Sequence, residues 1–172
     1  MNLFKKCIAS LLLILSFNAL HAQDITLKEG DAAPNFTLQS DEGKNVSLSD
    51  LKGKNVVLYF YPKDQTSGCT KEACSMRDNL PKINALNTVV VGVSVDGVDS
   101  HKAFKAKENL NFILLADTEK KVSTQYSGLN ALGMARRVTF IIDKNGIIKK
   151  IFPKVDVAAH ADEVMAVLNG MK

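Results

Sequence analysis

Two uninterrupted runs of β-branched, aliphatic and aromatic residues place the strongest constraint on the fold of this chain. Residues 55–61 read NVVLYFY and residues 88–95 read TVVVGVSV. A strand with one face in water alternates apolar and polar residues, whereas a parallel strand covered by helices on both faces is apolar throughout. Both runs are therefore predicted to be strands that are buried on both faces, and Pro62 ends the first of them.

Shorter segments with strand or helix character follow these runs in alternation. Pro81 is expected to lie just beyond the first helix, and Ser100 is expected to cap the second. Alternating strands and helices, followed by an antiparallel hairpin and a last helix, predict an α/β fold with a mixed central β-sheet flanked by helices. The expected elements are an N-terminal β-hairpin within residues 24–50, helices at 69–80, 100–109, 118–126 and 158–171, and strands at 112–116, 137–143 and 147–152.

The first 22 residues have a different character from the rest of the chain. Lys5 and Lys6 precede a mainly apolar run at residues 8–17, and small and polar residues then lead to Ala22. This is the pattern of a secretory signal peptide, and the apolar run is shorter than the roughly 20 residues that a membrane span needs. We expect a signal peptide at 1–22, with a retained N-terminal anchor as the alternative.

Removal of such a peptide would leave one domain at residues 23–172, in a protein that is exported to the periplasm or the extracellular space. No stable membrane association is expected after cleavage. Charged residues are balanced, with 22 Lys and Arg against 18 Asp and Glu, and the two signs alternate along the chain. No basic block resembles a nucleic-acid footprint, so we expect no nucleic-acid partner.

Two cysteines are the candidate reactive residues of the chain. Cys7 lies in the signal segment, which leaves Cys69 and Cys74 in an export compartment that permits disulfides. A zinc site would need about four ligands, and the remaining histidines, His101 and His160, lie far from the pair in sequence. The spacing Cys-x4-Cys differs from the Cys-x-x-Cys of thioredoxin-type exchange, and no serine-hydrolase elbow or phosphate-binding loop is present. We therefore expect no metal, flavin or nucleotide cofactor.

Cys69 follows a polar loop that joins the end of a buried strand to the start of a helix. In open α/β sheets, ligands bind at this edge of the sheet. Unpaired backbone N–H groups and the helix dipole favour an anion at a helix N-terminus, so a thiolate at Cys69 is expected to be stabilised there. A half-buried structural cysteine is the alternative interpretation.

Helical spacing places the two cysteines on different faces of this helix. Cys69, Ala73, Met76 and Leu80 share one face, which is expected to pack on the sheet. Cys74 lies about 140° around the helix, at a Cα separation from Cys69 of about 8.7 Å. A disulfide needs Cα atoms within about 7 Å of each other. The pair is therefore either two unrelated thiols or a redox couple whose helix unwinds on oxidation.

Several motifs resemble those of a known family. Pro62, Thr66 and Cys69 form a Pro-xxx-Thr-xx-Cys pattern that resembles the active-site signature of the peroxiredoxins. The continuation CTKEAC at residues 69–74 resembles the peroxiredoxin Q subgroup, also called bacterioferritin comigratory proteins. Ser67 stands where that family usually has Pro, which removes a rigid φ restraint just before the cysteine. Further segments that are similar to the family are residues 30–36, 112–117 and 137–143.

This resemblance implies a thioredoxin-like fold and a thiol peroxidase activity. It assigns Cys69 as the peroxidatic cysteine and Cys74 as the resolving cysteine, which form an intramolecular disulfide. It also maps Thr66 and Arg137 onto positions that activate the peroxide, with Pro62 shielding the pocket. A guanidinium donates hydrogen bonds to a peroxide oxygen, and a hydroxyl can accept the peroxide proton, so these residue types suit the chemistry.

The expected function is thus the reduction of hydrogen peroxide and organic hydroperoxides, with a thioredoxin-like protein as the reductant. A monomer is favoured, with a dimer as the alternative. Adjacent strand residues face opposite sides of a sheet, so only one of Arg136 and Arg137 can face the site, and Arg136 is the alternative to Arg137. Without the motif, Thr66 would be interpreted as a helix cap. The competing function is a thioredoxin-like redox or binding protein without peroxidase turnover, which rapid peroxide consumption at Cys69 would exclude.

Overall fold

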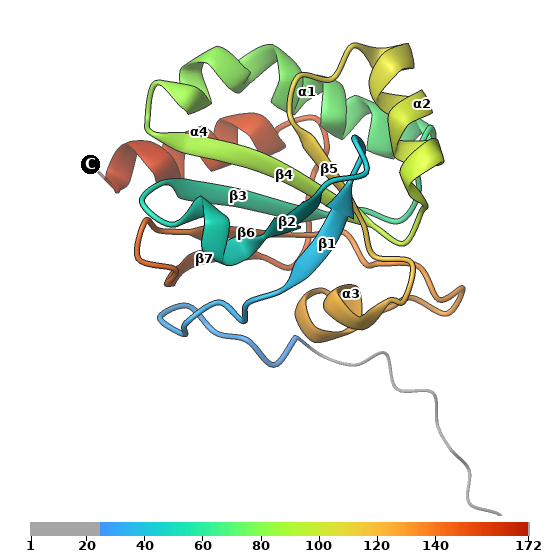
Figure 1. Cartoon of the computed structure of the whole chain (residues 1–172). Helices are drawn as coiled ribbons and strands as arrows, with labels where there is room; N and C mark the ends of the chain where they lie inside the picture. The colour runs from blue at the N-terminus through green and yellow to red at the C-terminus, as the bar shows by residue number, and fades with distance from the viewer. Residues whose placement is uncertain (1–24, 172) are drawn as a thin grey trace, which may run out of the picture.

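A mixed seven-stranded sheet forms the centre of the computed structural model, which describes residues 25–171 (Figure 1). The strand order is β2-β1-β5-β4-β3-β6-β7. The three central strands β3, β4 and β5 are parallel, and the other pairings are antiparallel, which confirms the predicted mixed sheet. The strands are β1 (Thr37–Ser40), β2 (Asn45–Ser47), β3 (Asn55–Phe60), β4 (Thr88–Ser94), β5 (Ile113–Ala116), β6 (Val138–Ile142) and β7 (Ile148–Phe152).

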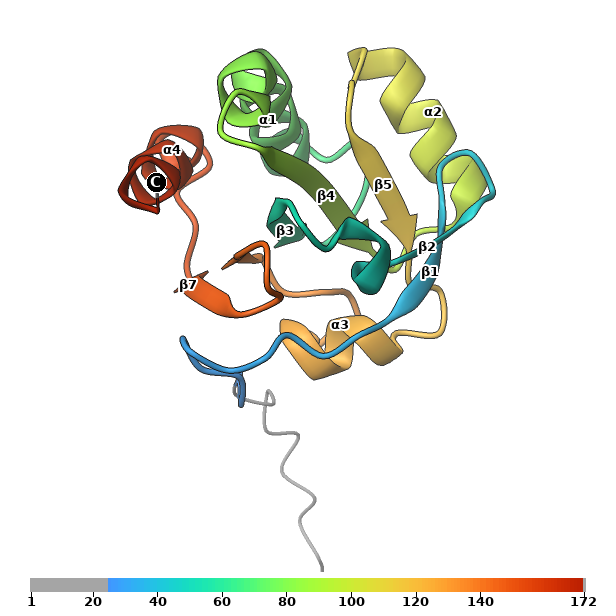
Figure 2. The same ribbon diagram turned by 60° about the vertical axis from the view of Figure 1, so that its left-hand side comes forward.

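Helices cover both faces of this sheet. Three of them, α1, α2 and α4, lie on one face, and α3 lies on the other (Figure 2). No helix within residues 25–171 is long and apolar enough to cross a membrane, and the predicted signal peptide at 1–22 falls outside the described residues. The helices are α1 (Ser67–Asn84), α2 (Val98–Glu108), α3 (Lys121–Tyr126) and α4 (His160–Gly170), and a short 3-10 helix η1 (Leu48–Leu51) follows the hairpin.

Strand β3 is buried on both faces, as its apolar run predicts. Val57 and Tyr59 contribute to the core beneath α1 and α4, whereas Leu58 and Phe60 contribute to the core beside α3. Successive strand residues point to opposite faces, so this one strand anchors both halves of the core. The N-terminal hairpin of β1 and β2 is also confirmed, and β1 extends the sheet by pairing antiparallel with β5.

Helix α1 is longer than predicted, because it continues through Pro81 and ends at Asn84. A proline inside a helix removes one backbone hydrogen bond and costs about 3 kcal/mol. Leu80 and Ile83 are both buried against the sheet on this last turn. Burial of two such side chains stabilises the turn by about 1.5–3 kcal/mol each, which offsets the proline.

Helix α2 begins earlier than predicted, at Val98, with Gly97 as its N-cap. The predicted cap, Ser100, lies within the first turn, and its hydroxyl instead donates to the side chain of Asp64. The sequence prediction was wrong here because a long-range partner outcompetes the local backbone for this hydroxyl.

Helix α3 starts at Lys121 rather than at Thr118. Lys120 has a left-handed backbone with φ of 62°, and the Asp117 carboxylate accepts a hydrogen bond from the Ser123 backbone N–H at 2.6 Å. The segment before Lys121 is therefore a turn. The remaining elements agree with prediction to within two residues at each end, which is the usual uncertainty of such boundaries.

Candidate active site

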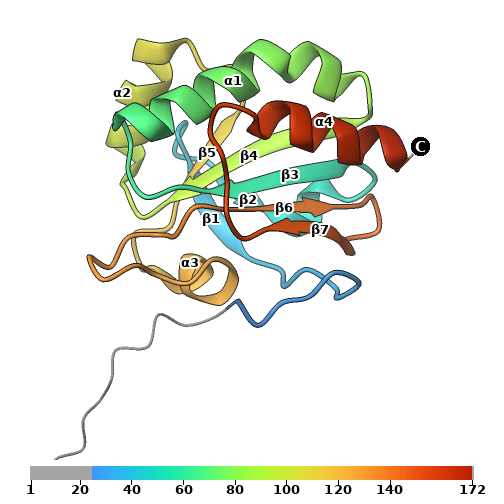
Figure 3. The same cartoon turned by 180° about the vertical axis from the view of Figure 1, so that it is seen from behind.

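Cys69 lies in the first turn of α1. The loop that leaves the end of β3 leads directly into this helix (Figure 3). Its side chain is only 1% exposed and packs in the core between α1 and the sheet. The predicted inward-facing set is confirmed, because Ala73, Met76 and Leu80 are buried on the same face. The helix N-terminus thus places a sulfur atom at the C-terminal end of the central strands.

Arg137 brings a positive charge to this sulfur. It immediately precedes β6, whose first residue Val138 pairs with Phe60 at the end of β3. The guanidinium donates a hydrogen bond to Cys69 Sγ at 3.1 Å. The guanidinium that the structure places beside the sulfur is that of Arg137, the residue that the resemblance maps there, and its role in the reaction stays a prediction. A cation at hydrogen-bond distance favours the thiolate form of a cysteine.

Glu72 completes this cluster, and the sequence reasoning did not single it out. Its carboxylate is fully buried and accepts a hydrogen bond from the Arg137 guanidinium. Burial raises the pKa of Glu72 to about 7, although Arg137 acts in the opposite direction. Burial disfavours the charge of Arg137, but Glu72 and Cys69 together raise the pKa of its guanidinium. Glu72 follows Cys69 by three residues on the inward helix face, and a buried acidic residue there indicates a cationic partner.

Thr66 and Pro62 frame the loop that leads to Cys69. Thr66 is the N-cap residue of α1, its side chain is exposed, and its hydroxyl donates to the Lys63 carbonyl at 3.1 Å. The structure therefore does not bring the Thr66 hydroxyl to the sulfur in this state, and its role in peroxide activation stays a prediction. Pro62 is half-buried and begins the loop directly after Tyr61.

Cys74 has different surroundings from Cys69. It is half-buried on another face of α1, and its Sγ lies 3.8 Å from the Glu108 carboxylate at the end of α2. Burial raises the pKa of the Cys74 thiol, Arg77 opposes this effect, and Glu108 reinforces it. Both cysteines are free thiols, and the helix between them is intact. The structure is thus the reduced state that the helical spacing predicts.

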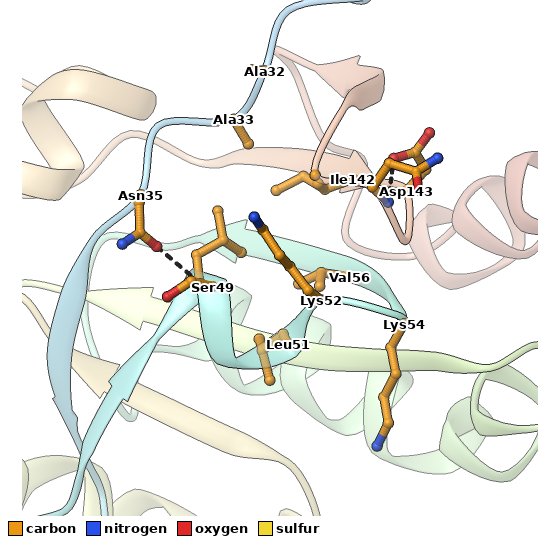
Figure 4. Close-up of a pocket in the computed structure, with 13 residues that line it drawn as sticks. Ala32, Ala33, Asn35, Ser49, Leu51, Lys52, Lys54, Val56, Ile142 and Asp143 are labelled. Carbon is orange, nitrogen blue, oxygen red and sulfur yellow. Dashed lines mark hydrogen bonds between the residues drawn. The ribbon is translucent and has the colours of Figure 1, made fainter.

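A separate cavity of about 280 Å³ lies at the opposite end of the sheet (Figure 4). Its floor includes Val56 at the start of β3 and Ile142 at the end of β6, and Lys52 and Lys54 also line it. None of its lining residues belongs to the cluster around Cys69. The chemistry of the two thiols therefore does not take place in this cavity.

Comparison with known proteins agrees with this geometry. Residues 29–151 match the model of the AhpC/TSA family. The chain is 43% identical over 155 residues to Peroxiredoxin Bcp of Bacillus subtilis, covering 86% of this chain and 98% of that protein. It is 42% identical over 147 residues to the chloroplastic Peroxiredoxin Q of Sedum lineare, covering 84% of this chain and 79% of that protein.

Solved structures show the same relationship. The crystal structure of a Xylella fastidiosa PrxQ mutant superposes with a TM-score of 0.80 at 30% identity, covering 84% of this chain and 97% of that chain. Peroxidoxin BcpB from Mycobacterium tuberculosis superposes with a TM-score of 0.79 at 32% identity, covering 85% of this chain and 99% of that chain. These neighbours share the thioredoxin-like fold that the sequence motifs imply. The chain therefore belongs to the AhpC/TSA family and is a peroxiredoxin, a thiol-dependent peroxidase similar to the Bcp and peroxiredoxin Q proteins.

Proposed function

We propose that this peroxiredoxin is an exported hydroperoxide reductase in which Cys69 is the peroxidatic cysteine and Cys74 is the resolving cysteine. The observation that carries the assignment is the 3.1 Å contact between the Arg137 guanidinium and Cys69 Sγ at the N-terminus of α1. A thiolate in a site of this kind is poised for attack on an electrophilic oxygen.

In the first step, the Cys69 thiolate attacks one peroxide oxygen and forms an S–O bond while the O–O bond breaks. The departing oxygen takes a proton and leaves as water or as an alcohol, and the sulfur becomes a sulfenic acid. Arg137 is placed to stabilise negative charge on the oxygens as the bond breaks. Thr66 takes part after its hydroxyl turns from Lys63 toward the peroxide, and Pro62 limits the access of water.

In the second step, the Cys74 sulfur attacks the sulfenic sulfur, which gives a Cys69–Cys74 disulfide and releases water. An intact helix separates the two Cα atoms by about 8.7 Å, which is too far for an unstrained disulfide. The first turns of α1 must therefore unwind between these two steps.

A thioredoxin-like dithiol protein then reduces the disulfide by thiol–disulfide exchange and becomes oxidised itself. The basic and apolar pattern of residues 1–22 supports export, so this reductant is expected in the same compartment. Organic hydroperoxides are included as substrates because a relative, the bacterioferritin comigratory protein of Xanthomonas campestris, has alkyl peroxide reduction activity. The structure of that relative superposes with a TM-score of 0.77 at 31% identity.

The chain is proposed to act as a monomer, with a dimer as the alternative. Within residues 25–171, Leu132 is the large apolar side chain that is strongly exposed, at 79%. One such residue forms no large apolar patch. Sedimentation equilibrium of the reduced protein tests this proposal, and a stable dimer at micromolar concentration would reject it.

Two cysteine variants test the assigned roles. Cys69→Ser should abolish peroxide reduction, because a serine hydroxyl does not form a sulfenic acid. Cys74→Ser should still reduce one equivalent of peroxide and then stop as sulfenic acid, which stopped-flow kinetics and intact mass spectrometry would detect. Equal first-step rates for the wild type and Cys69→Ser would reject the assignment.

Export has a test of its own. The N-terminus of protein isolated from its native host should lie at or near Gln23, outside the cytoplasm. N-terminal sequencing of the soluble protein is the measurement. Cytoplasmic protein that begins at Met1 would reject this part of the proposal without affecting the peroxidase assignment.

A further inference from the structure

The loop that leads into α1 runs close to α2 (Figures 1 and 3). A buried polar network lies beneath this loop, where α2 meets the sheet. At its centre, the carboxylate of Asp64 accepts hydrogen bonds from the hydroxyls of Tyr61 and Ser100, both at 2.7 Å. His101 Nδ1 lies 2.9 Å from the same carboxylate. Asp64 is 5% exposed and His101 is 0% exposed, so water does not share these contacts.

The acceptors around His101 favour a proton on both of its ring nitrogens. Its Nε2 lies 3.0 Å from the Leu115 carbonyl, which can only accept a hydrogen bond. Its Nδ1 faces a carboxylate that already accepts two hydroxyl hydrogens, and the Tyr61 hydroxyl is closer to Asp64 than to His101, at 2.7 Å against 3.4 Å. A hydrogen on each nitrogen would satisfy both acceptors, and the two side chains would then form a buried ion pair.

The charge state of Asp64 agrees with this interpretation. Burial raises the pKa of the Asp64 carboxyl, but hydrogen bonds from His101, Ser100 and Tyr61 outweigh burial and leave the pKa below its ordinary value. A buried ion pair offsets the cost of its desolvation only when further hydrogen bonds satisfy both partners. Here each partner has at least one additional bond, to α2 or to β5.

The same residue also fixes the backbone of the loop. The Asp64 backbone N–H donates to the Asp96 carboxylate at 2.8 Å, and that carboxylate also accepts the Ser94 hydroxyl at 2.8 Å. The next residue, Gln65, has a left-handed backbone with φ of 59°. This conformation is strained for a residue other than glycine, so the surrounding contacts must hold it in place.

We propose that the Asp64–His101 ion pair is a positioning device for the peroxidase reaction, which holds the loop before α1 so that Cys69 Sγ meets the Arg137 guanidinium. Arg137 is fixed by the pairing of β6 with β3, whereas Cys69 depends on where this loop starts the helix. When the anchor is lost, Gln65 relaxes and the first turn of α1 moves. A displacement of about 1 Å at a reacting atom costs about 10²-fold in rate.

Asp41 offers a matched control for this anchor. It is also a buried aspartate, 6% exposed, and it also bonds to α2 and β5, through Lys105 Nζ at 2.7 Å and the Leu114 backbone N–H at 3.0 Å. It lies at the β1–β2 turn, away from the loop before Cys69. Asp41→Asn therefore removes a comparable buried charge without disturbing that loop.

The experiment compares Asp64→Asn with Asp41→Asn. Urea unfolding gives the loss of stability in each variant, and stopped-flow mixing with hydrogen peroxide gives the second-order rate of the first step. We expect both variants to be destabilised, but only Asp64→Asn to slow the first step, by 10-fold or more. An unchanged rate in Asp64→Asn, or equal losses in both variants, would overturn the proposal.

Nuclear magnetic resonance detects the hydrogens on the ring nitrogens of His101, and a loss of stability alone does not change their number. Wild-type His101 should show hydrogens on both Nδ1 and Nε2, and Asp64→Asn should retain only one of them. A single ring hydrogen in the wild type would overturn the proposed ion pair.

Should Asp64→Asn fail to fold, a second pair of variants tests the same proposal. Ser100→Ala removes one donor to Asp64, and Lys105→Ala removes the corresponding donor to Asp41. Ser100→Ala should slow peroxide reduction by a few-fold, whereas Lys105→Ala should not. Equal rates of peroxide reduction in these two variants would overturn the proposal.

Discussion

Cys69 and Cys74 lie five positions apart on one helix and have opposite electrostatic surroundings. Cys69 is 1% exposed and receives a hydrogen bond from the Arg137 guanidinium. Cys74 is half-buried and faces the Glu108 carboxylate instead. A nearby cation favours a thiolate, and a nearby anion favours a neutral thiol. The helix face on which each cysteine lies therefore decides whether a cation or an anion contacts its sulfur.

This difference suits the order of the proposed reaction. The sulfur that attacks the peroxide must be a thiolate at the outset, whereas the second sulfur must not react before the first. In the proposed reaction, unwinding of α1 would end the burial that raises the pKa of the Cys74 thiol and would separate it from Glu108 on α2, which also raises this pKa. The proposed movement would therefore make the Cys74 thiol easier to deprotonate as it approaches Cys69.

The largest expected effect comes from removing the cation at Cys69. Arg137→Ala should slow the first step by about 10²–10³-fold, because one preorganised donor to the developing charge is lost. Stopped-flow kinetics with hydrogen peroxide is the measurement. The neighbouring variant Arg136→Ala is the matched control and should retain a rate close to that of the wild type. A similar loss in both variants would show that general charge, rather than the contact with the sulfur, is responsible.

The second prediction concerns Glu72, the other partner of Arg137. A folded-state pKa of about 7, above the ordinary 4.5, means that its neutral form stabilises the fold. This contribution is fully present below about pH 4.5 and is lost as the pH rises through 7. Between pH 5 and pH 8 the wild type should lose about 2–3 kcal/mol more than Glu72→Gln, which does not ionise. Urea unfolding at both pH values measures this, and a difference that does not change with pH would contradict it.

The third prediction concerns the effect of oxidation on the helix that carries both cysteines. Formation of the Cys69–Cys74 disulfide should reduce amide hydrogen-exchange protection at residues 70–77 by at least about tenfold, because the helix must open to close the bond. Strands β3 and β4 should change little. Exchange is measured on both redox forms after mass spectrometry has confirmed the disulfide. Unchanged protection in α1 would show that the pair bonds without unwinding this helix.

The smallest effect is expected at the anion beside Cys74. Glu108→Gln weakens the contact between Cys74 Sγ and α2 in the intact helix, so Cys74 should leave α2 more readily when α1 unwinds. The disulfide-forming step should then accelerate by a few-fold, while the first step keeps its rate. Rapid quenching with mass analysis separates the two steps. As a control, Glu119→Gln removes an exposed carboxylate elsewhere and should leave the rates of both steps unchanged. If it accelerated the disulfide-forming step as much as Glu108→Gln does, the net charge of the protein rather than the contact with Cys74 would be responsible.

Local sequence patterns determined much of the fold. The apolar runs that became β3 and β4 are buried on both faces, as their composition requires. The spacing of Cys69, Ala73 and Met76 correctly placed the sulfur on the inward face of α1. Such predictions succeed because burial on a strand or a helix imposes a period of two or about 3.6 residues on the sequence itself.

Only the tertiary structure decided which groups meet at the reactive sulfur. Arg137 is 68 residues from Cys69 and 65 from Glu72 along the chain, and the pairing of β6 with β3 brings them together. Ser100 was expected to cap α2, but it bonds to Asp64 from 36 residues away. Side-chain hydrogen bonds of this kind have no period in the sequence, because strand pairing and helix packing set their geometry rather than any local repeat.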